Sequence, residues 1–186
     1  MTSIGKLDIN DLTPGAFRPY GWMLGKPMPD GNGVPLFSNP ATDFWQEHLF
    51  NTGAGGDAQL LWVNYRNRSS EVSNLEKHLL TQQAIVPLTG EIIQIVAQSA
   101  VDGSPDLATL AAFRVPQGQG VCMQPGCWHA TRIAGTEVTC LMMTRCSTTA
   151  DLIQHLTTSA SATESAIMDI PMQRLQGLTA GAEIAG

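Results

Sequence analysis

The chain has 186 residues, of which 43% are apolar and 14% are charged. This length suits one domain, and the apolar fraction is enough to build a core, so the composition excludes intrinsic disorder for most of the chain. The formal net charge is −6 and the sequence contains no basic run. These features exclude the electrostatic footprint of a nucleic-acid-binding protein and disfavour binding to an anionic membrane surface.

The N-terminal region carries aspartates and prolines where a signal peptide would need an apolar core, and no apolar run is long enough to span a membrane. The four cysteines are not spaced as two C-x-x-C pairs, so neither a disulfide framework nor a thiolate zinc site is predicted. We therefore expect a cytoplasmic protein with reduced thiols.

Closely spaced prolines and glycines in residues 1–58 predict an irregular lead-in with short strands. The segment 59–66 (QLLWVNYR) is aromatic and β-branched, which predicts a longer strand. Further short apolar runs bounded by turn residues occur at 75–80, 83–88, 92–98, 111–115, 120–123 and 138–143. A helical turn is predicted at 107–110. Such a succession of short strands is typical of a β-sandwich or β-barrel.

Residues 147–186 form a tail that is rich in Ser, Thr and Ala. Leu152, Ile153 and Leu156 would share one face of a helix, which predicts a short helix at 151–156. The pattern weakens beyond Ser159, and no further element is predicted there. We therefore predict a single domain over 1–186 with its core at about 59–146.

Two of the four histidines lie in informative settings. In a strand, Glu76 and His78 project to the same face because side chains alternate. Gln83 opens the next apolar run, and His129 follows a strand and a Pro-Gly turn. These two segments resemble the two signature motifs of the cupin superfamily, which consists of small antiparallel β-barrels that hold a metal ion. The matching positions are Glu76, His78, Gln83, Gly90, Pro125, Gly126 and His129.

A longer series of matches, over roughly residues 59–146, resembles the ureidoglycolate lyase family, a cupin branch of the allantoin pathway. The matches include LEKH at 75–78, PDL at 105–107 and WH at 128–129, and they keep their order and gaps. The resemblance implies an all-β, cupin-type antiparallel β-barrel with an irregular N-terminal lead-in and a short helical C-terminal tail. It also implies an enzyme that splits ureidoglycolate into glyoxylate and urea, uses a divalent metal ion such as nickel, and forms a homodimer.

On this resemblance, the candidate metal ligands are Glu76, His78, Gln83 and His129, and the candidate catalytic residues are Glu76, His78 and His129. Imidazoles and carboxylates are suitable ligands for a borderline divalent ion. The alternative for the two histidines is a hydrogen-bonded pair in the core. Glu76 could instead be a surface carboxylate beside Lys77, and Gln83 an amide that lines the barrel.

The substrate implied by the resemblance is a small carboxylate, which a guanidinium can hold in a bidentate pair. Arg66 is the first candidate for this role, followed by Arg132 and Arg145. Gln83 and Trp128 are further candidates for substrate binding. Each arginine could instead lie on the solvated rim of the barrel, and Trp128 could belong to the core.

The chain departs from the family at Ala130, where a second histidine commonly follows the first. This departure leaves two other functions open. One is a related metal-dependent lyase, hydrolase or isomerase that acts on another small 2-hydroxy or 2-oxo acid. The other is a cupin that binds a small molecule without catalysis.

Overall fold

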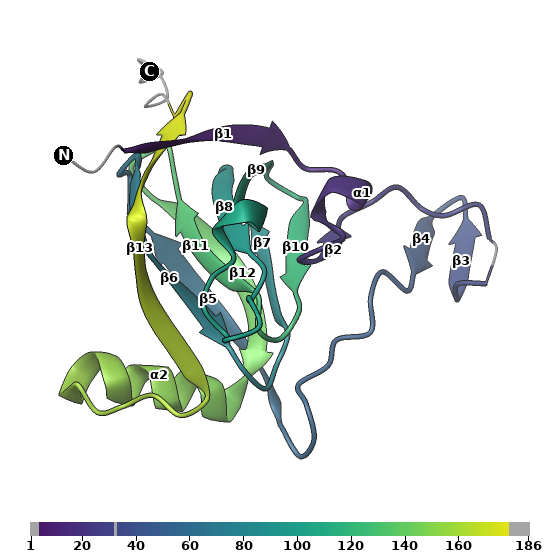
Figure 1. Cartoon of the computed structure of the whole chain (residues 1–186). Helices are drawn as coiled ribbons and strands as arrows, with labels where there is room; N and C mark the ends of the chain where they lie inside the picture. The colour runs from purple at the N-terminus through teal and green to yellow at the C-terminus, as the bar shows by residue number, and fades with distance from the viewer. Residues whose placement is uncertain (1–3, 32, 179–186) are drawn as a thin grey trace.

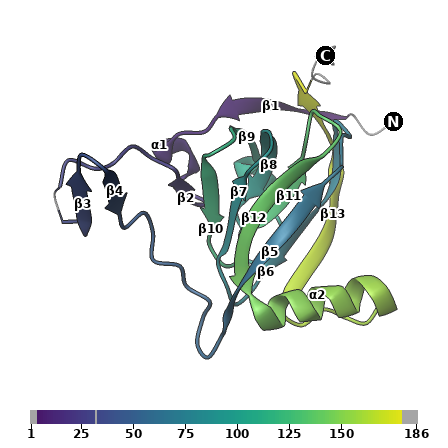
Figure 2. The same cartoon turned by 180° about the vertical axis from the view of Figure 1, so that it is seen from behind.

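The computed structural model describes residues 4–31 and 33–178. Two layers of strands make up the body of the molecule, and a separate hairpin extends away from it (Figure 1). One layer is a closed barrel with the strand order β1-β13-β6-β11-β8-β9. The other, which we call the facing sheet, has the order β2-β10-β7-β12-β5. The same arrangement is seen from behind in Figure 2.

The bounds of the elements are as follows. The closed barrel contains β1 (Gly5–Asp11), β6 (Glu71–His78), β8 (Ile92–Ala97), β9 (Ala111–Val115), β11 (Trp128–Arg132) and β13 (Ser165–Gln176). The facing sheet contains β2 (Gly21–Leu24), β5 (Ala58–Tyr65), β7 (Gln83–Pro87), β10 (Gly120–Met123) and β12 (Val138–Arg145). The remaining elements are α1 (Pro14–Phe17), β3 (Leu36–Asn39), β4 (Thr42–Trp45), the 3₁₀ turn η1 (Leu107–Thr109) and α2 (Cys146–Thr158).

The central strands form nested antiparallel pairs. β8 pairs with β9, β7 with β10, β6 with β11, and β5 with β12. Apart from the β8–β9 hairpin, consecutive strands from β5 to β12 alternate between the facing sheet and the closed barrel. This double winding is the architecture of a cupin-type barrel, so the predicted all-β fold is confirmed.

Two apolar cores lie on opposite faces of the barrel strands. One core is enclosed by the barrel and includes Leu75 and Trp128. The other lies between the barrel and the facing sheet and includes Ile85 and Phe113. Because side chains alternate along a strand, the neighbours of Leu75 and Trp128 project toward the facing sheet. This alternation directs Glu76 and His129 into the space between the two layers.

The C-terminal region contributes more structure than its composition predicts. The helix α2 is longer than the predicted 151–156, and residues 165–176 form β13. β13 is antiparallel to β6 and parallel to β1, and β1 is also parallel to β9. The predicted core of 59–146 is therefore too narrow, because β1 and β13 close the barrel. A register shift in β13 between Asp169 and Gln173 interrupts the alternation by which a strand is recognised.

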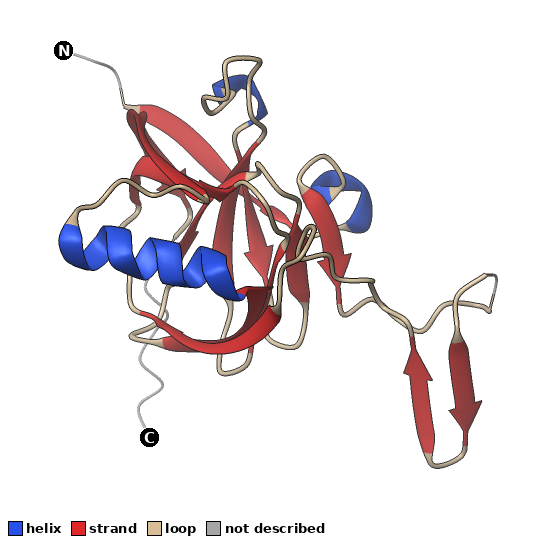
Figure 3. Cartoon of the chain, turned by 90° about the horizontal axis from the view of Figure 1, so that it is seen from below, coloured by secondary structure: helices blue, strands red, loops and turns tan. Residues whose placement is uncertain are grey.

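The lead-in combines short elements with irregular chain. The Thr13 hydroxyl caps α1 by accepting a hydrogen bond from the Ala16 amide at 3.2 Å, and proline occupies the first turn. The β3–β4 hairpin stands apart from both sheets (Figure 3), and Phe37 stacks on Phe44 within it. Within residues 4–31 and 33–178, none of the helices is long and apolar enough to cross a membrane.

Candidate metal centre

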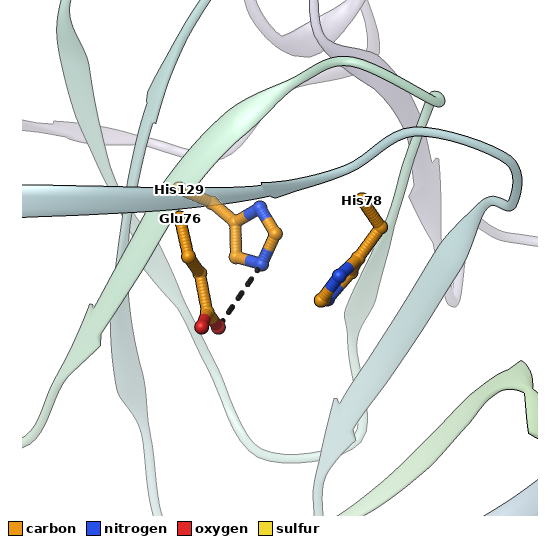
Figure 4. Close-up of side chains that lie close together, drawn as sticks. All are labelled: Glu76, His78 and His129. Atoms are coloured by element: carbon orange, nitrogen blue, oxygen red, sulfur yellow. Dashed lines mark ion pairs between the residues drawn. The ribbon is translucent and has the colours of Figure 1, made fainter. Parts of the chain in front are cut away.

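Glu76, His78 and His129 lie together between the closed barrel and the facing sheet (Figure 4). Each offers one ligand atom, and these atoms lie within 4.8 Å of one another. The register of the strands explains this arrangement. His129 on β11 is directly opposite Glu76 on β6, and His78 follows Glu76 by two residues on the same face. The structure thus brings three of the four predicted ligands into one cluster.

The ring of His129 has a defined tautomer. Its Nδ1 lies 3.0 Å from the carbonyl oxygen of Cys127, so Nδ1 carries a proton and donates. Its Nε2 is buried without a hydrogen-bond donor among the described residues and lies 3.4 Å from Oε1 of Glu76. A buried lone pair beside a carboxylate is unfavourable unless a proton or a cation lies between them. This orphaned nitrogen and its donor set therefore fit a divalent metal ion.

His78 is held from both sides. Its Nδ1 lies 3.1 Å from Oγ of Ser165, and its Nε2 lies 2.8 Å from the amide nitrogen of Gln83. Burial, helped by the neighbouring His129, lowers the pKa of His78 to about 4 against the opposing effect of Glu76. The ring is therefore neutral at pH 7. When its proton is on Nδ1, the lone pair of Nε2 points toward Gln83 and the cluster. Ser165 was not predicted, because it lies in the Ser/Thr/Ala-rich tail, where nothing distinguishes it from its neighbours.

Glu76 supplies the negative charge of the cluster. Burial raises the pKa of this carboxyl group, but the adjacent imidazoles of His129 and His78 outweigh burial and lower it. The carboxylate is consequently ionised at neutral pH. One anion with two imidazoles and a nearby amide is a donor set suited to a borderline divalent ion.

A cavity of about 370 Å³ adjoins the cluster. Glu76, His78 and Gln83 form one part of its wall, and the remaining wall comes from β5, β12 and α2. These other residues are Leu61, Val63, Tyr65, Met142, Thr144, Thr148, Thr149, Leu152 and Leu156. Leu152 and Leu156 belong to the predicted apolar stripe of the helix. Glu76, His78 and Gln83 are therefore accessible to a small molecule in this cavity.

Two predicted substrate-binding residues lie elsewhere. Arg66 follows the inward-facing Tyr65, so its exposed side chain points outward and pairs with Glu137 at 2.5 Å. Trp128 precedes His129 and points into the closed barrel, where its Nε1 donates to the carbonyl of Gly103 at 3.3 Å. The structure contradicts both predictions, because strand alternation places these side chains on the faces opposite the site.

The other two arginines are engaged in structural contacts. Arg132 donates hydrogen bonds to the carbonyls of Glu71 and Thr131 and lines a second cavity of about 240 Å³, which Glu76 and His129 also border. Arg145 donates to the carbonyl oxygens of Thr52 and Ala54. Among the described residues, the larger cavity has no guanidinium in its wall. A substrate-binding role for Arg132 stays a prediction that belongs to the smaller cavity.

The cysteines are free, and Cys122, Cys127 and Cys140 are buried. Burial raises the pKa of Cys127 to about 12, although this residue is only two positions from His129. Its thiol is protonated at neutral pH, and a protonated thiol is a poor metal ligand. The cluster is therefore built from imidazole and carboxylate groups.

The metal-free protein is expected to lose stability as the pH falls from about 6.5 to about 4. In the unfolded chain, His78 takes up a proton near its ordinary pKa of 6.5, whereas in the folded protein the ring stays neutral until the pH approaches about 4. Between these two pH values, the unfolded state therefore binds more protons than the folded state. The loss attributed to His78 is about 3 kcal/mol at the acidic end. The lowered pKa of Glu76 acts in the same direction, because the folded carboxylate resists protonation.

Thermal unfolding after chelation, measured at several pH values, checks this expectation. The His78→Gln variant should show a flatter dependence on pH because it lacks the titrating ring. Profiles of equal slope in the two proteins would contradict the assignment to His78.

The comparisons with known proteins agree with the geometry. The sequence model of the ureidoglycolate lyase family matches residues 4–164. A ureidoglycolate lyase of Escherichia coli O9:H4 is 38% identical over 137 residues, which cover 72% of this chain and 83% of that relative. The ureidoglycolate lyase of Brucella anthropi is 29% identical over 132 residues, covering 69% of this chain and 75% of the relative.

Solved structures show a partial likeness. The structure of RmlC from Streptococcus suis in complex with dTDP-D-xylose gives a TM-score of 0.40 at 9% identity, and the match covers 59% of this chain and 60% of that chain. The epimerase NovW of Streptomyces spheroides gives a TM-score of 0.40 at 12% identity, with coverages of 62% and 69%. The family match extends over most of the sequence and contains all three residues of the cluster. This chain belongs to the ureidoglycolate lyase family.

Proposed function

We propose that this protein is a lyase that breaks the C–N bond of ureidoglycolate and releases glyoxylate and urea. The observation that carries the proposal is the cluster of Glu76, His78 and His129, of which Glu76 and His78 line the larger cavity, in a chain of this family. The alternatives of a different small acid or of a non-catalytic cupin gain no comparable support. A cytoplasmic location and a homodimeric assembly stay predictions from the sequence.

We further propose that Glu76, His78 and His129 hold a divalent metal ion, with Gln83 beside them. Nickel is the identity that the family resemblance favours. Such an ion, when bound, would lower the pKa of the substrate hydroxyl and neutralise the substrate carboxylate. This role suits the larger cavity, whose described wall offers no arginine or lysine for that carboxylate.

The protein groups in the cavity match the proton transfers that the reaction needs. Cleavage requires that the hydroxyl of the hemiaminal carbon loses a proton and that the leaving nitrogen gains one. Glu76 is the anionic side chain in the cavity wall and is our candidate for accepting the hydroxyl proton and passing it to the leaving nitrogen. The Gln83 amide and the Thr144 hydroxyl are positioned in the same wall to donate hydrogen bonds that orient the substrate.

The direct test is to supply the purified protein with Ni²⁺ or Mn²⁺, add ureidoglycolate, and follow glyoxylate release above the spontaneous rate. Arg66→Gln is a matched control, because Arg66 lies outside the cavity and should leave the rate unchanged. A protein that is folded and metal-loaded, yet does not accelerate glyoxylate release, would overturn the proposal.

Replacing Gln83 by glutamate is expected to increase the affinity for a divalent ion by about tenfold or more. The amide nitrogen of Gln83 lies 2.8 Å from Nε2 of His78 and occupies the lone pair that a metal would use. A carboxylate at this position removes that donor and adds an anionic ligand. Competition with a chromophoric chelator measures the affinity.

Gln117→Glu is a suitable control for the charge change, because Gln117 is exposed and hydrogen-bonded to the backbone of Leu88. It should leave the metal affinity unchanged. If the Gln83→Glu variant binds the ion no more tightly than this control, position 83 lies outside the coordination sphere.

A further inference from the structure

The larger cavity has two chemically different walls. Glu76, His78 and Gln83 form the polar wall, whereas Leu61, Val63, Met142, Leu152 and Leu156 form an aliphatic wall over β5, β12 and α2. Ureidoglycolate carries a carboxylate, a hydroxyl and a urea group, and it has no alkyl group to place against leucine. The aliphatic wall therefore exceeds what the substrate of the proposed function can use.

One unsatisfied polar group also belongs to the wall of this cavity. Thr144 lines the cavity, and its hydroxyl is buried without a hydrogen-bond partner among the described residues. A urea carbonyl oxygen accepts hydrogen bonds and would satisfy this donor.

The helix α2 supplies the part of the aliphatic wall that protein covers least. Leu156 is 68% exposed although it lines the cavity, so its apolar surface is available to a ligand. Burying one methylene group against such a surface strengthens binding about fourfold. A short alkyl chain would therefore increase affinity severalfold.

We infer that the cavity accepts ureido acids whose distal nitrogen carries an alkyl group. This inference rests on the proposed function and names a broader substrate class for the same site. The reaction is unchanged for such substrates. The bond between the hydroxyl-bearing carbon and nitrogen breaks, and its electron pair goes to nitrogen, which takes up a proton. The hydroxyl loses a proton and becomes the carbonyl of glyoxylate, so an alkylurea leaves in place of urea.

Binding of the leaving group tests the cavity without any turnover. Titration calorimetry with urea and with N-butylurea should show at least a tenfold preference for N-butylurea. Leu152→Asn should remove this preference because it makes the aliphatic wall polar. Ile153→Asn is the matched control on the same helix, because Ile153 is exposed and does not line the cavity. It should retain the preference.

Thr144→Val supplies a second variant of nearly unchanged shape. It should weaken the binding of both ureas alike while preserving their ratio, because it removes only the hydroxyl. Thermal unfolding establishes that each variant is folded. Equal binding of urea and N-butylurea to the wild-type protein would overturn the inference, as would a preference that survives Leu152→Asn.

Turnover separates this inference from the proposed function. The wild-type protein should cleave N-butylureidoglycolate with a kcat/KM at least equal to that for ureidoglycolate. Cleavage of ureidoglycolate alone would overturn the broader substrate class and leave the proposed function standing. A preference for N-butylurea in binding, without cleavage of either substrate, would overturn the proposed function.

Discussion

Replacing His129 by alanine is expected to abolish the retention of a divalent ion and to lower kcat/KM for ureidoglycolate about a thousandfold. His129 holds its ring through the Cys127 carbonyl and directs an unpartnered Nε2 toward Glu76. Its removal leaves the Glu76 carboxylate without a partner across the β6–β11 pair. Elemental analysis of the purified variant and the glyoxylate assay measure the two effects.

His155→Ala is the control, because His155 lies on α2 outside the wall of the larger cavity and hydrogen-bonds to the backbone of Ala160. It should retain both the ion and the activity. Retention of a stoichiometric ion by both the His129→Ala protein and the His78→Ala protein would show that the cluster is not the metal centre.

Trp128→Ala is expected to lower the free energy of unfolding by about 3–5 kcal/mol. Trp128 is 1% exposed inside the closed barrel, and Nζ of Lys77 lies 4.5 Å from the centre of its ring. The substitution therefore leaves a cavity and removes the cation–π contact of a lysine that is itself buried. Equilibrium unfolding in urea measures the change.

Trp62→Ala provides a matched control for the loss of an indole. Trp62 is 70% exposed, and its replacement should change the free energy of unfolding by about 0.5 kcal/mol or less. Similar losses in the two variants would show that the barrel interior does not depend on Trp128. Comparison with His129→Ala separates the two faces of β11, since one residue supports stability and its neighbour supports metal binding.

The central strands were predictable because each short apolar run ends at a turn residue. The predicted strands at 83–88 and 120–123 correspond closely to β7 and β10. Local patterns could not predict that Glu76 would lie opposite His129, because this register depends on how distant strands pair. The resemblance to a family supplied the pairing of the two motifs, and the structure shows its geometry.

The face on which a residue lies was harder to predict. Both faces of β11 are buried, since one contacts the barrel core and the other contacts the space under the facing sheet. The sequence therefore does not indicate whether Trp128 faces the site or the core of the barrel. β13 was missed because Pro171 and the register shift interrupt its alternation.

The position of β13 has a consequence for how the molecule is made. This strand lies between β6 and β1 in the ring, and its first residue, Ser165, holds the ring of His78. During translation, a nascent chain that ends at α2 already contains every nested pair but lacks the strand that joins β1 to β6. The ring closes, and His78 gains its hydrogen-bond partner, only after β13 has also emerged from the ribosome. The site is therefore completed later than the nested strand pairs that carry Glu76 and His129.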